Sequence, residues 1–486
     1  MTGLGPINIA ILIAYVLGMV GIGVYLARKQ KTKDDYFLGG RTMPWLAVAM
    51  SLYASVTSAM TYMGLPGLGY RGNLSLLLVA VMSPLAAPVL IFGIYPVYRR
   101  LGITTSYEYI EIRFNATARK SAATLFMLAR LGWLGPVIYA PSLALHVATG
   151  FPLAYAVMVI GALATLYCTM GGLRAVIWTD VPQFIIMIGG AIWILATLHQ
   201  ADTGGITEIL RQAGLTQGGF GLDWRFDLTR MTATSVAIAY FFILIHDYGV
   251  DQISVQRLMA IRTNRGVSRA LAFNAATDFV IIGLLLLIGV GLSLYYTQHP
   301  GQLPETITGE KVLPYFITHV LPDGLSGLLI AALFAAAMSS VDSGINAMSA
   351  VLLTDLFPGR EHPTHPIRQA RILTAVLGFG ATGFALFIYQ QIQSIVDSFY
   401  TFMGLFSAPV LGLFALGMMT RRATFTGWLA GAISSVLFCF IAGARGWMAE
   451  IYFFPVGTIL TLSIGYGMSL ILPPARNRDE RGGDPG

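Results

Sequence analysis

Long apolar runs recur along the whole chain, and short polar segments separate them. Each run is close to the roughly 20 residues that an α-helix needs to cross a bilayer, whereas a spanning strand would alternate apolar and polar residues over about 10. The pattern therefore predicts an all-α integral membrane protein with about thirteen transmembrane helices. We place them at residues 8–27, 45–70, 74–97, 121–148, 151–171, 178–198, 232–250, 268–296, 324–355, 367–390, 393–419, 423–443 and 452–472.

The composition supports a membrane location, because 56% of the 486 residues are hydrophobic and only 11% are charged. Such a chain has too few polar side chains to cover an aqueous surface. Its formal net charge of +7 reflects basic residues that gather in alternate connections, among them Arg99, Arg174, Arg257 and Arg421. Cytoplasmic connections hold an excess of Lys and Arg. The pattern predicts an outside N-terminus and a cytoplasmic C-terminus, and the short connections fit a bacterial inner membrane.

Two of the predicted spans contain unusual polar and small residues. The second includes "ASVTSAMTYMGLPGLG" (54–69), and the ninth includes "AALFAAAMSSVDSGINAMSA" (331–350). Close helix packing accounts for the glycines. The clustered hydroxyls instead favour a broken helix, because irregular backbone is tolerated at membrane depth only where it is buried in protein or lines a cavity. From the second span to the eleventh there are ten helices, with these two first and eighth, as in a pair of inverted five-helix repeats.

Four long segments carry a resemblance to a known family. They are "DDYFLGGRTMPWLAVAMSLYASVTSAMTYMGLPGLGY" (34–70), "YCTMGGLRAVIWTDVPQF" (167–184), "YGVDQISVQRLMA" (248–260) and "AALFAAAMSSVDSGINAMSAVLLTDLF" (331–357). Together they resemble the sodium:solute symporter family. The stretch "GPVIYAPSLALHVATG" (135–150) looks most like the branch with the monocarboxylate, multivitamin and iodide transporters. The resemblance implies Na⁺ as the coupling ion and a preference for anions.

The resemblance also implies a division of the chain. A first peripheral helix with its inner loop occupies residues 1–44, and the ten-helix inverted-repeat transport core, of the type called LeuT-like, occupies residues 45–420. Two flanking C-terminal helices cover residues 421–472. The polar, Pro- and Gly-rich residues 473–486 are predicted to form a disordered cytoplasmic tail.

A first sodium site is implied by the family's motifs. The family binds Na⁺ with backbone carbonyls of the broken first core helix and with a carbonyl and two hydroxyls of the eighth. Several neutral oxygens suit a hard cation that must also be released. Mapped onto this sequence, these residues are Ala54, Thr57, Ala336, Ser339 and Ser340.

Some family members have a second sodium site, which maps here to Asp180, Ser339, Asp342 and Ser343. Members with that site more often have Ser or Thr where this chain has Asp342. Two carboxylates near one ion would either bind Na⁺ more tightly or share a proton. The alternative for Asp180 is a residue at the cytoplasmic mouth that pairs with Arg174.

Ionisable residues at membrane depth are candidates for solute binding, because their burial is costly. Arg130 lies in the middle of the fourth span, and its planar fork suits a substrate carboxylate. The alternative is a structural ion pair with Asp278 or Asp247. Asp278 itself falls where sugar-transporting relatives place a solute-contacting residue.

Three hydroxyls complete the predicted solute site, although packing is an alternative for each of them. They are Ser58, Thr61 and Ser83.

These residues and the resemblance predict sodium-coupled import, by alternating access, of a carboxylate-bearing solute such as a monocarboxylate or an acidic sugar such as sialic acid. The alternatives are proton coupling, transport of an amino acid, sugar or polyol, and, in a different class, an ion or solute channel. No HExxH, GxSxG or phosphate-binding Gly-rich motif indicates an enzyme. Expected partners are the solute, Na⁺ and the lipid bilayer, with no nucleic acid, transition metal or obligate protein partner.

Overall fold

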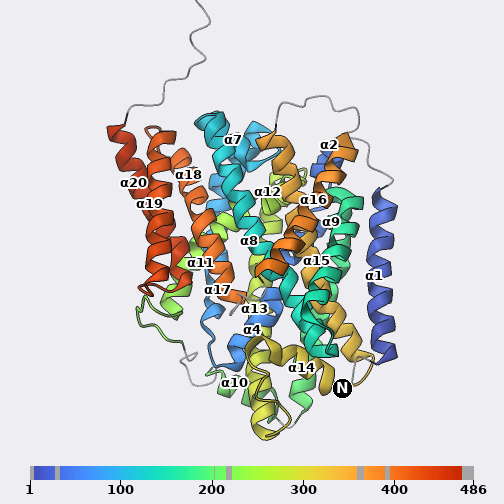
Figure 1. The fold of residues 1–486 in the computed structure, drawn as a ribbon. Helices are drawn as coiled ribbons and strands as arrows, with labels where there is room; N and C mark the ends of the chain where they lie inside the picture. Colours follow the sequence, from blue (N-terminus) through green and yellow to red (C-terminus); the bar gives the residue numbers. More distant parts are fainter. Residues whose placement is uncertain are drawn as a thin grey trace, which may run out of the picture.

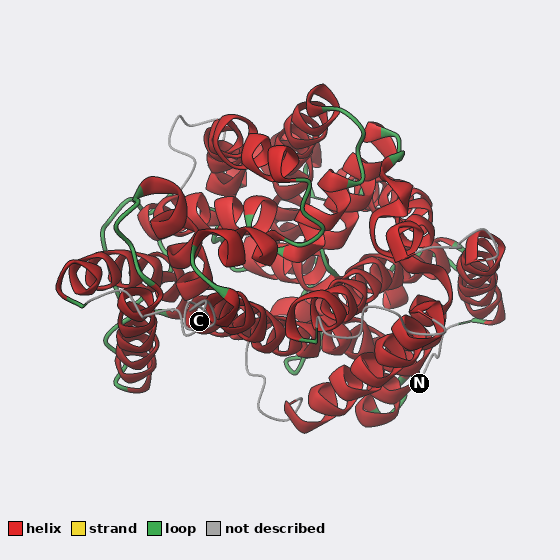
Figure 2. Ribbon diagram, turned by 90° about the horizontal axis from the view of Figure 1, so that it is seen from above, coloured by secondary structure: helices red, strands yellow, loops and turns green. Residues whose placement is uncertain are grey.

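The computed structural model describes residues 5–27, 33–201, 203–214, 222–357, 366–388 and 395–472. Within these ranges the fold is helical, and a single bridge between Met43 and Ile261 is the only extended pairing. Figure 1 shows most of the long helices running along one common direction, with α1 at one edge and α19 and α20 at the other. The view from above shows helices across the whole section and loops between them (Figure 2). The predicted disordered tail, residues 473–486, lies outside the described residues.

The first half of the chain contains ten helices within the described residues. They are α1 (Pro6–Ala27), α2 (Lys33–Leu38), α3 (Trp45–Val56), α4 (Ala59–Tyr70), α5 (Val79–Pro88), α6 (Tyr95–Leu101), α7 (Ser106–Arg113), α8 (Ala116–Thr149), α9 (Leu153–Gln200) and α10 (Gly205–Gln212). The π-helical segment η3 (Val89–Ile94) joins α5 to α6. Two 3-10 turns, η1 (Gly39–Arg41) and η2 (Ser75–Leu78), precede α3 and α5.

The described residues of the second half contain another ten helices. They are α11 (Ala233–Gly249), α12 (Gln252–Met259), α13 (Asn264–Gln298), α14 (Val312–His319), α15 (Leu325–Val351), α16 (Pro366–Ile388), α17 (Ile395–Phe402), α18 (Ala408–Met419), α19 (Phe425–Ala444) and α20 (Phe453–Ile471). The π-helical segments η5 (Leu352–Leu356) and η6 (Met403–Ser407) continue α15 and join α17 to α18. The 3-10 turns η4 (Gly309–Lys311) and η7 (Glu450–Tyr452) precede α14 and α20.

The predicted membrane character is confirmed. In the described part of the chain, 10 helices are long and apolar enough to cross a membrane, and up to 12 if each of two bent helix pairs forms one span. A shorter apolar helix, Leu153–Leu166, falls on the predicted span 151–171. It belongs to α9, which is kinked at Gly172 where φ is 53° and ψ is −177°. That conformation favours glycine. The total of thirteen spans stays a prediction.

The helix α15 forms the centre of the molecule. It packs against α3, α8, α9 and α16, and 94% of the residues in its apolar window are buried. The corresponding fraction for α1 is 17%. A central helix can contribute backbone and side-chain groups to several neighbours, and α15 does so at the sites described below.

Glycines bring α4 and α13 into backbone contact. A Cβ added to Gly69 would lie 2.3 Å from the carbonyl oxygen of Leu286, and one added to Gly289 would lie 2.2 Å from that of Pro66. Both distances are far below van der Waals contact. Only residues without a side chain allow the two backbones to approach this closely.

Candidate functional site

The predicted broken helix is present, and its break lies at Thr57 and Ser58. These residues have ψ angles of 92° and 172°, and the axes of α3 and α4 differ by 61°. The glycine-rich stretch further along is helical and belongs to α4. The two halves of the unusual sequence therefore have separate roles, because the hydroxyls mark the break and Gly67 and Gly69 allow close packing.

The predicted first sodium site lies where the end of α3 meets the middle of α15. The hydroxyl of Ser339 lies 2.7 Å from the carbonyl oxygen of Ala54 and 3.2 Å from that of Ala336. The hydroxyl of Ser340 donates to the carbonyl of Ser55 at 3.0 Å. All of these groups are buried. The remaining predicted residue, Thr57, lines the adjoining cavity.

The chemistry of this first cluster fits an exchangeable cation. Its members are backbone carbonyls and serine hydroxyls, which are neutral oxygen ligands. The carbonyl of Ser55 was missed by sequence reasoning, which considered only Ala54 and Thr57 on this helix. The break itself supplies these groups, because carbonyls at the end of α3 lack the next helical turn as partner.

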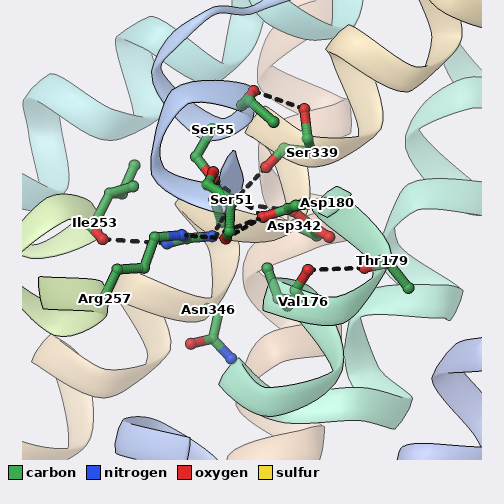
Figure 3. Close-up of polar contacts among 12 residues, drawn as sticks. Ser51, Ser55, Val176, Thr179, Asp180, Ile253, Arg257, Ser339, Asp342 and Asn346 are labelled. Atoms are coloured by element: carbon green, nitrogen blue, oxygen red, sulfur yellow. Dashed lines mark hydrogen bonds and ion pairs between the residues drawn. The ribbon is translucent and has the colours of Figure 1, made fainter. Parts of the chain in front are cut away.

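The predicted second cation site is a more strongly charged cluster, shown in Figure 3. The carboxylate Oδ2 of Asp180 on α9 accepts from the hydroxyl of Ser51 at 2.6 Å and lies 3.3 Å from that of Ser55. The hydroxyl of Ser343 lies 2.8 Å from that of Ser55, 3.1 Å from Oδ1 of Asp342 and in short contact with the carbonyl of Ser339. The four predicted residues therefore belong to one connected network.

The guanidinium of Arg257 also belongs to this network. Its Nη2 lies 3.4 Å from Oδ2 of Asp180 and in short contact with the hydroxyl of Ser343. Both Arg257 and Asp180 are completely buried. The prediction that Arg257 lies in a cytoplasmic connection is wrong, and so is the alternative in which Asp180 pairs with Arg174. The physical reason is a second bent pair, α11 and α12, whose axes differ by 49° and which carries Arg257 into the interior.

A cavity of about 130 Å³ lies beside the break in α3 and α4. Four of the five predicted solute-binding residues line it, namely Ser58, Thr61, Arg130 and Asp278. The fifth, Ser83, donates to Oδ2 of Asp278 at 2.6 Å and so supports it. Hydroxyls of Ser58 and Ser254 line the cavity and make no hydrogen bond within the described residues. Ser254 was missed because its segment was interpreted as a loop.

Arg130 is held at the cavity wall by an acid that the sequence did not single out. Its Nε donates to Oδ2 of Asp251 at 2.9 Å, and its Nη2 makes a short contact with the same oxygen. The guanidinium also lies 4.7 Å from the ring centre of Trp133. Arg130 therefore forms an ion pair, as the alternative predicted, but its partner is Asp251 and neither Asp278 nor Asp247.

Asp251 owes its position to the local structure of the chain. It is the N-cap of α12, where its Oδ1 accepts from the backbone N–H of Ile253 at 2.9 Å. Its other oxygen is left for Arg130. Asp247, one turn earlier, also lines the cavity and lies 3.0 Å from Nδ1 of His246. The second helix break thus supplies acids to the cavity wall, as the first supplies hydroxyls.

Comparisons with known proteins identify relatives of this chain. A model described as the sodium:solute symporter family matches residues 36–435. The Sodium/sialic acid symporter SiaT of Proteus mirabilis (strain HI4320) is 31% identical over 475 residues, covering 96% of this chain and 95% of the relative. The human Sodium-coupled monocarboxylate transporter 1 is 34% identical over 430 residues, which cover 85% of this chain and 69% of that protein.

Solved structures give the same result for the fold. A Na⁺-coupled sialic acid symporter, solved in a substrate-bound, outward-open state with a novel Na⁺ site, matches with a TM-score of 0.89 at 30% identity and covers 97% of this chain and 99% of that one. A nucleobase-cation-symport-1 family transporter matches with a TM-score of 0.57 at 14% identity, with coverage of 91% and 95%. The second likeness concerns the fold alone.

Proposed function

The chain belongs to the sodium:solute symporter family, and from that premise we propose that it imports a small carboxylate-bearing solute together with Na⁺. Membership makes it a sodium-coupled integral membrane transporter and no enzyme. We further propose that residues 45–420 form the transport core, that the N-terminus is outside, and that the host membrane is a bacterial inner membrane. Bacterial relatives and the distribution of basic residues support these proposals.

One observation carries the choice of solute, namely a guanidinium at the wall of an intramembrane cavity. Arg130 lines this cavity together with Ser58 and Thr61. Guanidinium groups bind carboxylates through charge-assisted hydrogen bonds in a fixed planar geometry. Asp251 and Trp133 hold Arg130 in place, so that little side-chain entropy remains to be lost when a solute binds.

The names of the relatives support this choice. Two are sialic acid symporters and others are monocarboxylate transporters, so that an acid is the solute in each name. A carboxylate would bind close to the break, whose carbonyls and hydroxyls also form the proposed sodium site. Coupling between ion and solute requires that each favours the same conformation of the protein. A shared broken helix provides a direct route for that linkage.

A second candidate is a solute that also carries a hydrogen-bond donor, such as an amino acid or a hydroxy acid. Asp278 favours it, because this carboxylate lines the cavity and accepts, within the described residues, one hydrogen bond, which comes from Ser83. A carboxylate of this kind can accept further hydrogen bonds from a hydroxyl or ammonium group. The alternative of proton coupling then concerns only a second coupling ion: a buried acid could bind H⁺ in addition to the Na⁺ that the protein uses.

The experiment is thermal unfolding of the purified full chain with a panel of carboxylates, sugars and amino acids, each in NaCl and in KCl. A ligand that binds only the folded state raises the melting temperature by mass action. We expect a carboxylate to stabilise the protein in NaCl and much less in KCl. Stabilisation by neutral sugars alone would contradict the proposal.

Variants of Arg130 make the experiment specific. We expect Arg130→Lys, which keeps the charge next to Asp251 but loses the planar fork, to weaken carboxylate binding about tenfold or more. Stabilisation by Na⁺ alone should persist. Arg113→Lys is the matched control, because Arg113 bonds the backbone carbonyls of Gly417 and Thr420 instead of lining the cavity. Equal carboxylate affinity in both variants would contradict the role of Arg130.

A further inference from the structure

Two buried hydroxyls at the wall of the cavity lack a hydrogen-bond partner among the described residues. They belong to Ser58 and Ser254, which line the cavity and are each 1% exposed. A buried hydroxyl without a partner costs free energy, so the cavity has to supply the partner that the protein does not. We propose that Ser254 is a specificity-determining residue, whose hydroxyl donates, together with that of Ser58, to the carboxylate of the solute.

The hydroxyl of Ser254 lacks the partner that helical serines often use. Such a serine bonds the carbonyl four residues earlier, as Ser142 does with Ile138 at 2.7 Å. The carbonyl four residues before Ser254 belongs to Val250, and it accepts from the hydroxyl of Ser106 at 2.8 Å. The local structure therefore leaves the hydroxyl of Ser254 available to a ligand in the cavity.

The hydroxyl of Ser58 is left available in the same way. The carbonyl of Ala54, four residues earlier, lies 2.7 Å from the hydroxyl of Ser339. Ser58 is the N-cap of α4, and its side chain makes no capping hydrogen bond within that described helix. Ser254 lies in the first turn of α12. Both hydroxyls thus lie at N-terminal ends of helices, where the helix dipole favours an anion.

Arg130 leaves acceptor positions of a bound carboxylate unfilled. One edge of its guanidinium, Nε and Nη2, is engaged by Asp251, so that only the remaining N–H groups of Nη1 and Nη2 are left for a solute. They fill about two of the roughly four acceptor positions of a carboxylate. The hydroxyls of Ser58 and Ser254 supply further donors. Asp251 does not compete for them, because its other oxygen accepts from the N–H of Ile253.

The inference rests on the proposed function and adds a rule of selectivity to it. A carboxylate bound by Ser58 and Ser254 connects the break between α3 and α4 with the bend between α11 and α12. A neutral amide at the same place is a poorer acceptor, because hydrogen bonds to charged groups are about twice as strong. Ser254 would therefore favour acids over their neutral analogues.

The test is titration of the purified full chain in NaCl with lactate, a simple monocarboxylate, and with sialic acid, an acidic sugar, followed by thermal unfolding. We expect Ser254→Ala to bind the acid about tenfold more weakly or worse, and its preference for lactate over the neutral lactamide to fall. Ser254→Thr keeps the hydroxyl and should retain most of the affinity. Without solute, Ser254→Ala should melt no lower than the wild type, because it loses no hydrogen bond to the described residues.

Ser142→Ala is the matched control, because this buried serine lies outside the cavity and its hydroxyl is bonded. It should lower the melting temperature slightly and leave the affinity unchanged.

The outcomes separate this inference from the proposed function. Equal affinity for the acid in Ser254→Ala and the wild type would overturn the inference alone. A Ser254→Ala protein that does not fold, or that loses solute-free stability as Ser142→Ala does, would show a structural role and overturn it as well. If neither acid stabilises the wild type, the proposed function fails, and the inference fails with it.

Discussion

Two clusters of oxygen atoms adjoin the end of α3, and both share the helix α15, yet their charges differ. The first contains the carbonyls of Ala54 and Ala336 and the hydroxyl of Ser339. The second contains the carboxylate of Asp180 and the guanidinium of Arg257. Neutral ligands suit a cation that must leave in every cycle. A fixed cation neutralises a carboxylate permanently and does not have to be recruited from solution.

The comparison teaches that helix breaks supply the two clusters in different ways. The break in α3 and α4 exposes carbonyls, whereas the bend between α11 and α12 brings a charged side chain into the interior. Ser55 connects both clusters, because its carbonyl accepts from Ser340 and its hydroxyl lies 2.8 Å from that of Ser343. A change at one cluster can therefore reach the other through a single residue.

The largest effect is expected from removing the acid of the second cluster. Asp180→Asn leaves Arg257 buried without its ionic partner, and this should lower the free energy of unfolding by about 3–5 kcal/mol. Thermal unfolding of the purified protein measures the loss. The double variant Asp180→Asn/Arg257→Gln removes both charges and should recover most of it. Equal stability of the single and double variants would show that the pair does not act as a unit.

A smaller effect, on the solute, is expected at the cavity. Asp278→Asn should weaken binding of acids that also carry a hydroxyl or ammonium group by about tenfold, since a hydrogen bond to a charged group is lost. Plain monocarboxylates and Na⁺ should bind as before. Ligand-induced shifts in melting temperature check this. Ser83→Ala is the control that keeps the carboxylate, and a larger effect from it than from Asp278→Asn would contradict the assignment.

The smallest effect is expected at the first cluster, where several neutral ligands share the ion. Ser340→Ala should raise the half-saturating Na⁺ concentration about fivefold, because one hydrogen-bonding group of about 1 kcal/mol is removed. Ser340→Thr keeps the hydroxyl and should resemble the wild type. Sodium titrations followed by thermal unfolding provide the measurement. Unchanged sodium dependence in Ser340→Ala would remove this residue from the site.

Much of the fold could be predicted because crossing a membrane is a local property of about 20 residues. The break in α3 and α4 could also be predicted, since its hydroxyls stand out in an apolar run. The bend between α11 and α12 was missed for the opposite reason. Asp251 caps its second half, which contains Gln252 and Arg257, and such polar residues are typical of a loop when their burial is unknown.

The pairings within the site could not be predicted, because they join residues far apart in the sequence. Arg130 and Asp251 are 121 residues apart, and Asp180 and Arg257 are 77 apart. Tertiary packing alone selects such partners. The acids considered for Arg130 were those inside predicted spans, so that Asp251 was left out by its assignment to a connection.

The glycine contact between α4 and α13 has a mechanical consequence. Because neither Gly69 nor Gly289 leaves room for a Cβ, we expect α4 and α13 to move as one rigid body during alternating access. Thr61 on α4 and Asp278 on α13 would then move together, whereas Arg130 lies on a different helix, α8. A solute bound by residues of both parts would hold them together, and its length would determine how closely α8 approaches α4 and α13.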